Sequence, residues 1–371
     1  MHELTHVLGF STSLYQYYRN AWGQPRSIVV DANNRIVTEQ VVNMARTFFD
    51  CMQMNGVELE NQGGQGTAGS HWEMRIFRDE YMVGILPLSP KVGTITLGLL
   101  EDTGWYKPQY EDAQRVIFGE YQGCDFVNKP CLTPGFVPTT QFPRFFPNPN
   151  IGSALMGCSP DRTYAAAAYV KQYGSQLPYN YYYANSGIGG LLPLADFCPV
   201  WNEYGDPCQP ETKCIINNLV KACPAGGCPS LRGSCLRNGC SADRTQLRIF
   251  MPTGTESIVC PPGGGLVTLP GVGWFGSVLC PPVAEICGFA ITDCPQLCWG
   301  RGRCVNGTGG APTCKCNFNY LPPDCATRAT PKPQGSTPKP TSTQKQATPK
   351  PPTPKPPTPS KRPPTPKPPT P

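Results

Sequence analysis

Apolar residues recur at helical spacing in the first third of the chain. Residues 39–54 carry one apolar face, which predicts a helix with a buried side made of Val41, Val42, Ala45, Phe48, Phe49 and Met52. Residues 91–103 repeat the pattern, and Gly104 predicts where that helix ends. The Gly- and Gln-rich segment 61–69 lacks this periodicity and predicts a loop.

A third helix is predicted over residues 1–10. Leu4, Val7, Leu8 and Phe10 supply an apolar side that can pack on a core. Gly9 can end this helix in a left-handed cap and turn the chain. The same ten residues contain two of the chain's three histidines.

The pattern changes after about residue 130. Residues 131–290 alternate short apolar runs with Pro, Gly, Asn and Cys, which predicts an irregular, mainly β domain. Its aromatic cluster is interpreted as a loop packed on the core rather than a ligand platform, and consists of Tyr179, Tyr181, Tyr182 and Tyr183. Residues 294–325 hold six cysteines in a unit too small to fold without cross-links. Residues 327–371 repeat Thr-Pro-Lys-Pro and predict a disordered, polyproline-type tail.

Twenty cysteines predict a disulfide framework formed in an oxidising compartment. Metal-binding knuckles are the alternative, but no pair of CxxC motifs with zinc-finger spacing is present. No signal peptide opens the sequence, and no long apolar run predicts a membrane span or a GPI signal. We therefore expect a piece of an extracellular or cell-surface protein, beginning inside the helix that carries His2 and lacking upstream segments.

The formal net charge of +6 comes from the tail. Eight of the 31 Lys and Arg residues lie in 329–371, which contains no acid, so 23 basic residues face 25 acidic ones elsewhere. The tail is interpreted either as a spacer or as a basic strip for anionic glycans or lipids. No segment has the pattern of a nucleic-acid-binding module, and we expect no such partner.

The three histidines stand where a zinc protease needs them. His2 and His6 are four residues apart, so a helix aims both at one ion, and Glu3 can serve as general base towards a water. His71 would complete a three-nitrogen set with one open position, as catalytic zinc requires and structural zinc does not. The alternatives are two exposed helix histidines and a structural or solvated His71.

The segments 2–11 (HELTHVLGFS), 69–73 (GSHWE) and 79–82 (DEYM) closely resemble the leishmanolysin family of metzincin metalloproteases. The resemblance implies zinc ligation by His2, His6 and His71, with Glu3 as general base. It also implies a turn at Gly9 and a hydrophobic floor at Met82, although an ordinary core methionine is the alternative there. Cysteine landmarks at 124–131, 196–200 and 280–287 extend the resemblance to about residue 290.

We expect an α+β fold in four parts, of which the first two follow from this resemblance and the third from the likeness of the cysteine spacing in 294–325 to an EGF-like module. These are a metzincin-like catalytic region (1–130), a disulfide-rich, mainly β domain (131–290), an EGF-like module (291–326) and the disordered tail (327–371). Within the catalytic region, Cys51 and Cys124 are plausible partners. The EGF-like spacing implies the pairs Cys294–Cys304, Cys298–Cys314 and Cys316–Cys325. A glycosylation sequon begins at Asn306.

The function that follows is zinc-dependent hydrolysis of peptide bonds in extracellular or surface proteins, with an accompanying role in cell adhesion. The cofactor is one zinc ion, and the partners are protein or peptide substrates. The rival hypothesis is a truncated, inactive surface binding or adhesion protein with a relic zinc site. A helix lacking its first turns is costly to nucleate, which is why the rival is retained.

Overall fold

The computed structural model describes residues 1–132, 142–177, 187–269 and 273–288, with 294–295, 298, 302–306, 311–316 and 320–328 of the last cysteine-rich unit. Three predictions lie outside these ranges: the aromatic cluster at 179–183, the sequon residues after Asn306, and the tail from residue 329 onward. No helix among the described residues combines the length and apolar character that crossing a membrane demands.

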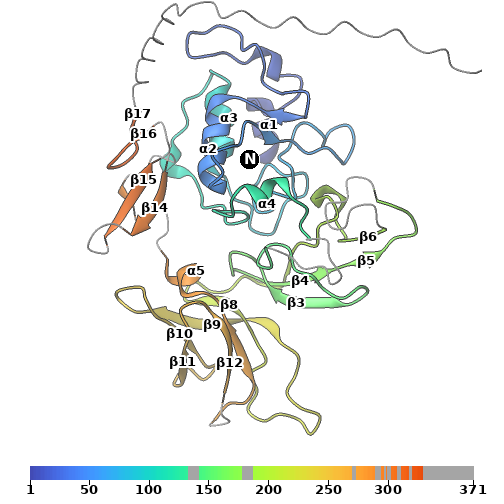
Figure 1. The fold of residues 1–371 in the computed structure, drawn as a ribbon, viewed down its shortest axis with the longest axis vertical. Coiled ribbons are helices and arrows are strands. Elements are labelled where there is room, and N and C mark those ends of the chain that lie inside the picture. Colours follow the sequence, from blue (N-terminus) through green and yellow to red (C-terminus); the bar gives the residue numbers. More distant parts are fainter. Residues whose placement is uncertain are drawn as a thin grey trace, which may run out of the picture. The chain divides into compact units, whose positions relative to one another are not determined.

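The described residues form short helices in the first part and small antiparallel sheets in the second (Figure 1). The helices are α1 His2–Leu8, α2 Glu39–Phe49, α3 Thr94–Asp102, α4 Cys124–Asn128 and α5 Val283–Cys287, with single 3-10 turns η1 Tyr15–Tyr17, η2 Tyr110–Asp112 and η3 Pro193–Ala195. The strands before residue 205 are β1 Arg35–Ile36, β2 Val57–Glu58, β3 Ala154–Cys158, β4 Ala165–Tyr169, β5 Lys171–Gln172, β6 Ile188–Gly189 and β7 Asn202–Tyr204. Those after it are β8 Thr212–Asn217, β9 Arg232–Cys240, β10 Leu247–Phe250, β11 Ser257–Val259, β12 Gly265–Thr268, β13 Ser277–Cys280, β14 Gly302–Asn306, β15 Pro312–Cys316, β16 Tyr320–Leu321 and β17 Thr327–Arg328.

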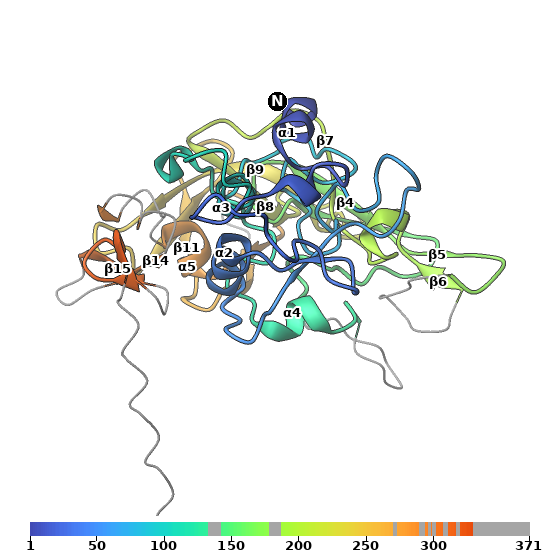
Figure 2. The ribbon, with the colours of Figure 1, turned by 90° about the horizontal axis from the view of Figure 1, so that it is seen from above.

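The two predicted amphipathic helices are present and pack against each other as α2 and α3 (Figures 1 and 2). The buried residues of α2 include Val41, Ala45 and Phe49, as the periodicity predicted. The prediction was wrong at Met52, which is 51% exposed. Asp50 adopts the left-handed conformation and ends the helix first, so Met52 is no longer on its buried face.

Helix α1 is present, but the predicted packing side was wrong at three of its four residues, and only Phe10, just after the helix, is buried. Leu4, Val7 and Leu8 are exposed, and Thr5 is the helix's one buried residue. Gly9 does end the helix, since its N–H bonds to the carbonyls of Thr5 and His6. Its φ of 158° and ψ of −30° are not the predicted left-handed cap; a side chain there would meet the Thr103 methyl group.

The mainly β character predicted after residue 130 is confirmed. Six antiparallel strands form a sheet in the order β11-β10-β9-β8-β13-β12, and β3-β4-β7 form a separate sheet. In the larger sheet, Ile215, Leu247 and Val278 turn to a small core that α5 joins through Val283. Gly233 of β9 lies so close to the backbone of Gly157 in β3 that a side chain cannot fit, which brings the two sheets into contact.

One turn occurs twice. The hexapeptides 158–163 (CSPDRT) and 240–245 (CSADRT) connect β3 to β4 and β9 to β10. In each, the aspartate accepts hydrogen bonds from the serine hydroxyl and from the threonine, and the arginine has a positive φ. Both arginines reach α5: Arg162 pairs with Glu285, and Arg244 donates to the carbonyl of Gly288. The two turns, after β3 and after β9, thus each contribute an arginine that contacts α5 or the residue that follows it.

All twenty cysteines are paired, as the framework prediction required. The first seven pairs are Cys51–Cys124, Cys131–Cys198, Cys158–Cys214, Cys208–Cys235, Cys223–Cys228, Cys240–Cys287 and Cys260–Cys280. In the last unit the pairs are Cys294–Cys304, Cys298–Cys314 and Cys316–Cys325, the same as the EGF-like spacing implied. The EGF-like identity of this unit and the four domain boundaries stay predictions.

Arg75 is buried and forms polar contacts with three segments that are distant in the sequence. Its guanidinium is 1% exposed and pairs with Asp196 at 3.0 Å and Glu58 at 2.8 Å. It also donates to the carbonyl of Val127 at 3.1 Å. Asp196 is itself 1% exposed, so without Arg75 its charge would lie buried and uncompensated.

Replacing Arg75→Met is expected to lower the free energy of unfolding by about 3–5 kcal/mol, the usual cost of removing one partner of a buried ion pair. Urea unfolding of the oxidised protein measures it. Lys129→Met is the matched control, because both members of the Lys129–Asp125 pair are 53% exposed. It should cost about 0.5 kcal/mol. Equal losses in the two variants would contradict a stabilising role for the Arg75 network.

Candidate metal centre

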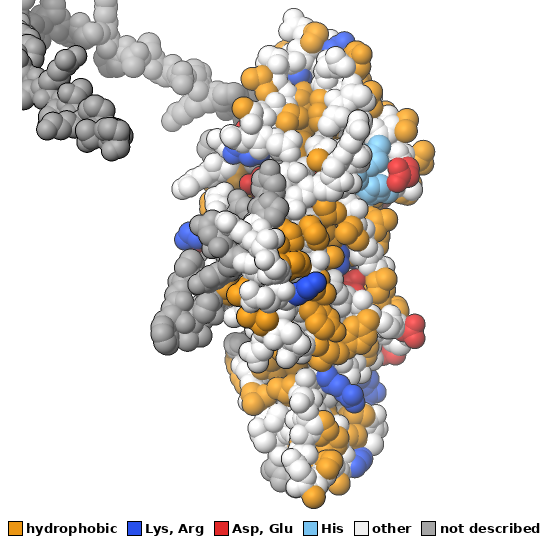
Figure 3. Space-filling model, turned by 90° about the vertical axis from the view of Figure 1, so that its right-hand side faces the viewer, with side chains coloured by type: hydrophobic (Ala, Val, Ile, Leu, Met, Phe, Trp, Pro, Cys, Tyr) orange, Lys and Arg blue, Asp and Glu red, His pale blue; other side chains and the backbone are white. Residues whose placement is uncertain are grey.

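The structure brings the three histidines together. His2 and His6 extend from the same face of α1, and His71 arrives from the end of the 61–70 loop. The Nε2 atom of His2 lies 3.1 Å from that of His71 and 3.2 Å from that of His6. Figure 3 shows the histidine side chains gathered at the surface beside an acidic side chain.

The other ring nitrogen of each histidine is committed to a backbone carbonyl. His2 Nδ1 lies 2.6 Å from the oxygen of Tyr81, and His6 Nδ1 lies 2.8 Å from that of Phe10. His71 Nδ1 lies 2.9 Å from the oxygen of Thr67. A carbonyl can only accept, so a neutral ring places its single proton on Nδ1. Three Nε2 lone pairs then face one another with no proton to share.

This donor set fits a zinc ion. Zinc–nitrogen bonds of about 2.0–2.1 Å in tetrahedral geometry put the nitrogens about 3.3 Å apart, close to the separations from His2. Carbonyl partners on the far nitrogen are the usual arrangement behind metal-binding histidines. Another close group of potential ligands, Cys294, Cys298 and Cys314, is engaged in disulfides and offers no thiolate.

Backbone hydrogen bonds hold His71 in place. The N–H of Glu60 donates to the carbonyl of His71, and the N–H of Gly69 donates to the carbonyl of Glu60. The N–H of Trp72 donates to the carbonyl of Met82 at 2.9 Å. The segment that bears His71 is thus bonded on one side to residue 60 and on the other to residue 82.

The 79–82 segment contacts α1 through Tyr81, whose carbonyl oxygen lies 2.6 Å from His2 Nδ1. Met82 is fully buried, and its N–H donates to the Glu80 carboxylate. The same carboxylate accepts from the Gly93 N–H at the start of α3 and from the Thr96 hydroxyl. Sequence reasoning singled out Met82 but assigned no role to Tyr81, whose contacts to α1 leave no local signal in the sequence.

Charge and burial together favour the neutral form of His71. Burial lowers the pKa of His71, and the neighbouring His6 and His2 lower it further, while the Thr67 carbonyl and the charge of Glu3 oppose these effects. Glu3 is exposed on α1 and lies near enough to interact electrostatically with His71. Burial also raises the pKa of Tyr81 to about 12, so its hydroxyl keeps its proton.

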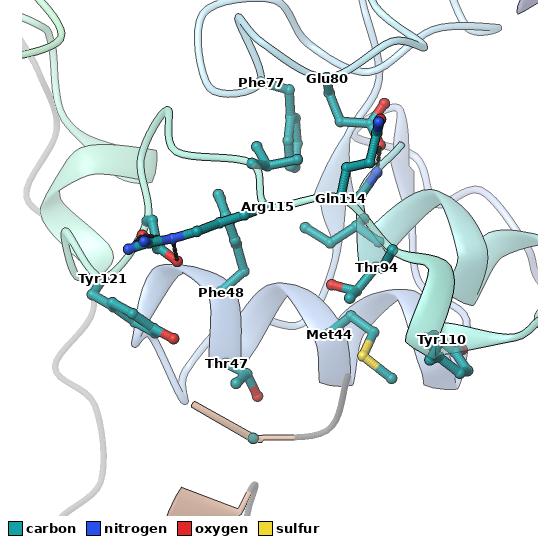
Figure 4. A pocket seen from close by; sticks show the side chains of 16 residues that line it. Met44, Thr47, Phe48, Phe77, Glu80, Thr94, Tyr110, Gln114, Arg115 and Tyr121 are labelled. Atoms are coloured by element: carbon teal, nitrogen blue, oxygen red, sulfur yellow. Dashed lines mark hydrogen bonds and ion pairs between the residues drawn. The ribbon is translucent and has the colours of Figure 1, made fainter. Parts of the chain in front are cut away.

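A pocket of about 80 Å³ is lined by α2, the start of α3 and residues 110–121, and also by Gly302 (Figure 4). No histidine lines it. Its walls are mainly apolar, with the Arg115–Glu120 ion pair at one side. Glu80 lines this pocket and also accepts a hydrogen bond from the N–H of Met82.

Known proteins match most of the chain. A family model described as Leishmanolysin matches residues 1–293. A leishmanolysin-like peptidase of Caenorhabditis elegans is 30% identical over 55% of this chain and 39% of its own length. One from Drosophila melanogaster is 27% identical over 77% and 54%, and leishmanolysin of Leishmania major is 24% identical over 77% and 50%. The chain therefore spans about half the length of the curated relatives it matches, or less.

The buried Glu80 predicts a pH-dependent stability. Burial raises its pKa to about 7, against about 4.3 for a free glutamate. As the pH rises through this window, the unfolded chain releases the proton first, so stability falls between about pH 4.3 and 7 and this contribution is constant outside it. Over the window the wild type should lose of the order of 3 kcal/mol that Glu80→Gln does not lose.

Unfolding free energies at pH 4.5 and 7.5 measure this difference. Glu211→Gln, at an exposed glutamate, is the control and should keep the wild-type pH dependence. If Glu80→Gln also kept the wild-type pH dependence, the Glu80 carboxyl would be ionised throughout the range from pH 4.5 to 7.5.

Proposed function

The chain belongs to the leishmanolysin family, and on that premise we propose that it is a zinc-dependent endopeptidase whose metal is held by His2, His6 and His71. The observation that carries the proposal is the convergence of three Nε2 lone pairs, each fixed by a carbonyl behind its ring. Three neutral nitrogen ligands leave one position open, which favours a catalytic over a purely structural metal.

A zinc ion held by His2, His6 and His71 would supply the Lewis acid that activates water and polarises the scissile carbonyl. Glu3 follows His2 directly on α1, and its exposed carboxylate accepts the proton of the attacking water and returns it to the leaving amine. The carbonyls of Phe10, Thr67 and Tyr81 orient the rings and hold the Nδ1 proton of each, which leaves the Nε2 atoms as the ligands. Gly9 turns the chain after the helix, and Met82 forms the buried floor beneath the histidines.

We propose protein or peptide substrates outside the cell. Ten disulfides support synthesis in an oxidising compartment and an extracellular or cell-surface location. A role in adhesion and the binding of anionic glycans or lipids by the basic tail remain predictions from the sequence. No described contact favours the rival inactive binding protein over the protease.

Glu3→Gln tests the assigned base. The substitution keeps the size of the side chain and removes its basicity, so kcat for a quenched-fluorescent peptide should fall at least about 100-fold. Zinc content should stay at one ion per chain, because the three imidazoles are untouched. Peptide cleavage with and without a chelator, together with metal analysis, measures both.

Glu111→Gln is the matched control, since Glu111 is an exposed acid on η2 away from the histidines. It should cleave as fast as the wild type. A Glu3→Gln protein that retained zinc and full activity would remove Glu3 from the mechanism.

A further inference from the structure

Helix α1 contacts the rest of the fold mainly through polar groups. It spans His2–Leu8, and one of these seven residues is buried. Its apolar residues Leu4 and Val7 are 60% and 75% exposed, whereas Thr5 is 3% exposed. The orientation of the helix, and with it the aim of both its histidines, therefore depends on what Thr5 and the imidazoles contact.

Tyr81 makes two of these contacts. Its carbonyl oxygen accepts the His2 Nδ1 proton at 2.6 Å, and its hydroxyl lies 2.6 Å from Thr5 Oγ1. The Thr5 hydroxyl donates to the Met1 carbonyl at 3.3 Å, so the Tyr81 hydroxyl is the donor to Thr5. One residue thus bonds α1 at two positions three apart, which lie on neighbouring parts of one helix face.

Tyr81 is also bonded to a segment other than α1. Its N–H donates to the carbonyl of Lys91, and its side chain is 6% exposed. The flanking Glu80 carboxylate is bonded to the N–H groups of Met82 and Gly93 and to the Thr96 hydroxyl. The residue that contacts α1 is therefore part of a buried network that includes the start of α3.

We propose that Tyr81 is a positioning residue for the metal: its hydroxyl, through Thr5, fixes the rotation of α1 and so the approach of His2 and His6 to His71. The inference rests on the proposed metal site. A bond to His2 alone would orient one ring. The second bond, to Thr5, adds control of the rotation of the helix, because Thr5 lies between the two histidines in sequence and next to His2 in projection.

The test uses the full chain with Tyr81→Phe, Thr5→Val and the double variant. Zinc dissociation constants are measured by competition with a chromophoric chelator, and the visible spectrum of the cobalt-substituted protein reports ligand geometry. Each single variant should weaken zinc binding about tenfold and alter the cobalt spectrum, as loss of a supporting hydrogen bond does. The double variant should be no weaker than the weaker single variant, since both remove one interaction.

Two further variants separate positioning from stability. Thr5→Ser keeps the acceptor oxygen and should restore wild-type affinity. Tyr17→Phe, at a tyrosine that is 51% exposed, should change nothing. If Tyr81→Phe and Thr5→Val lowered only the melting temperature and left zinc affinity and the cobalt spectrum unchanged, Tyr81 would be structural and the proposed protease would stand. If the wild type took up no zinc, both proposals would fall together.

Discussion

The arrangement of the site depends on one constraint, which is that a neutral imidazole has two nitrogens and a single proton. Backbone carbonyls from Phe10, Thr67 and Tyr81 claim the Nδ1 proton of each histidine. The Nε2 lone pairs are left facing one another, with the His2 atom 3.1 Å from that of His71 and 3.2 Å from that of His6, and they repel unless a cation joins them. The three carbonyls come from separate segments, so the fold has to bring those segments together for the donor set to exist.

The groups that bring them together are mostly polar. The Glu80 carboxylate accepts hydrogen bonds from the N–H groups of Met82 and of Gly93 at the start of α3. The backbone of Glu60 is hydrogen-bonded to the carbonyl of His71. Arg75 forms ion pairs with Glu58 of β2 and with Asp196. Buried polar networks of this kind restrict geometry more narrowly than apolar contacts, because each bond has a preferred length and direction. A rigid support of this kind is what a metal site requires of its surroundings.

Much of the site could be predicted from the sequence because its signal is local. The four-residue spacing of His2 and His6 fixes a shared helix face, and α2 and α3 follow from apolar periodicity. The packing of α1 could not be predicted from the sequence, because periodicity shows which residues share a face but not which face is buried. The Tyr81–Thr5 bond joins residues 76 positions apart and leaves no local pattern. The repeated CSxDRT turn was not identified from the sequence, and its contacts with Glu285 and Gly288 leave no local pattern.

The most direct test of the account is the zinc X-ray absorption spectrum of the full chain, compared with that of His71→Ala. The account predicts one zinc per wild-type chain, with three imidazole nitrogens and one oxygen at about 2.0–2.1 Å. It predicts fewer imidazole ligands and weaker retention of zinc in the variant. A wild-type chain that held no zinc, or a variant with the same three-imidazole spectrum, would contradict the claim that these histidines form the metal site.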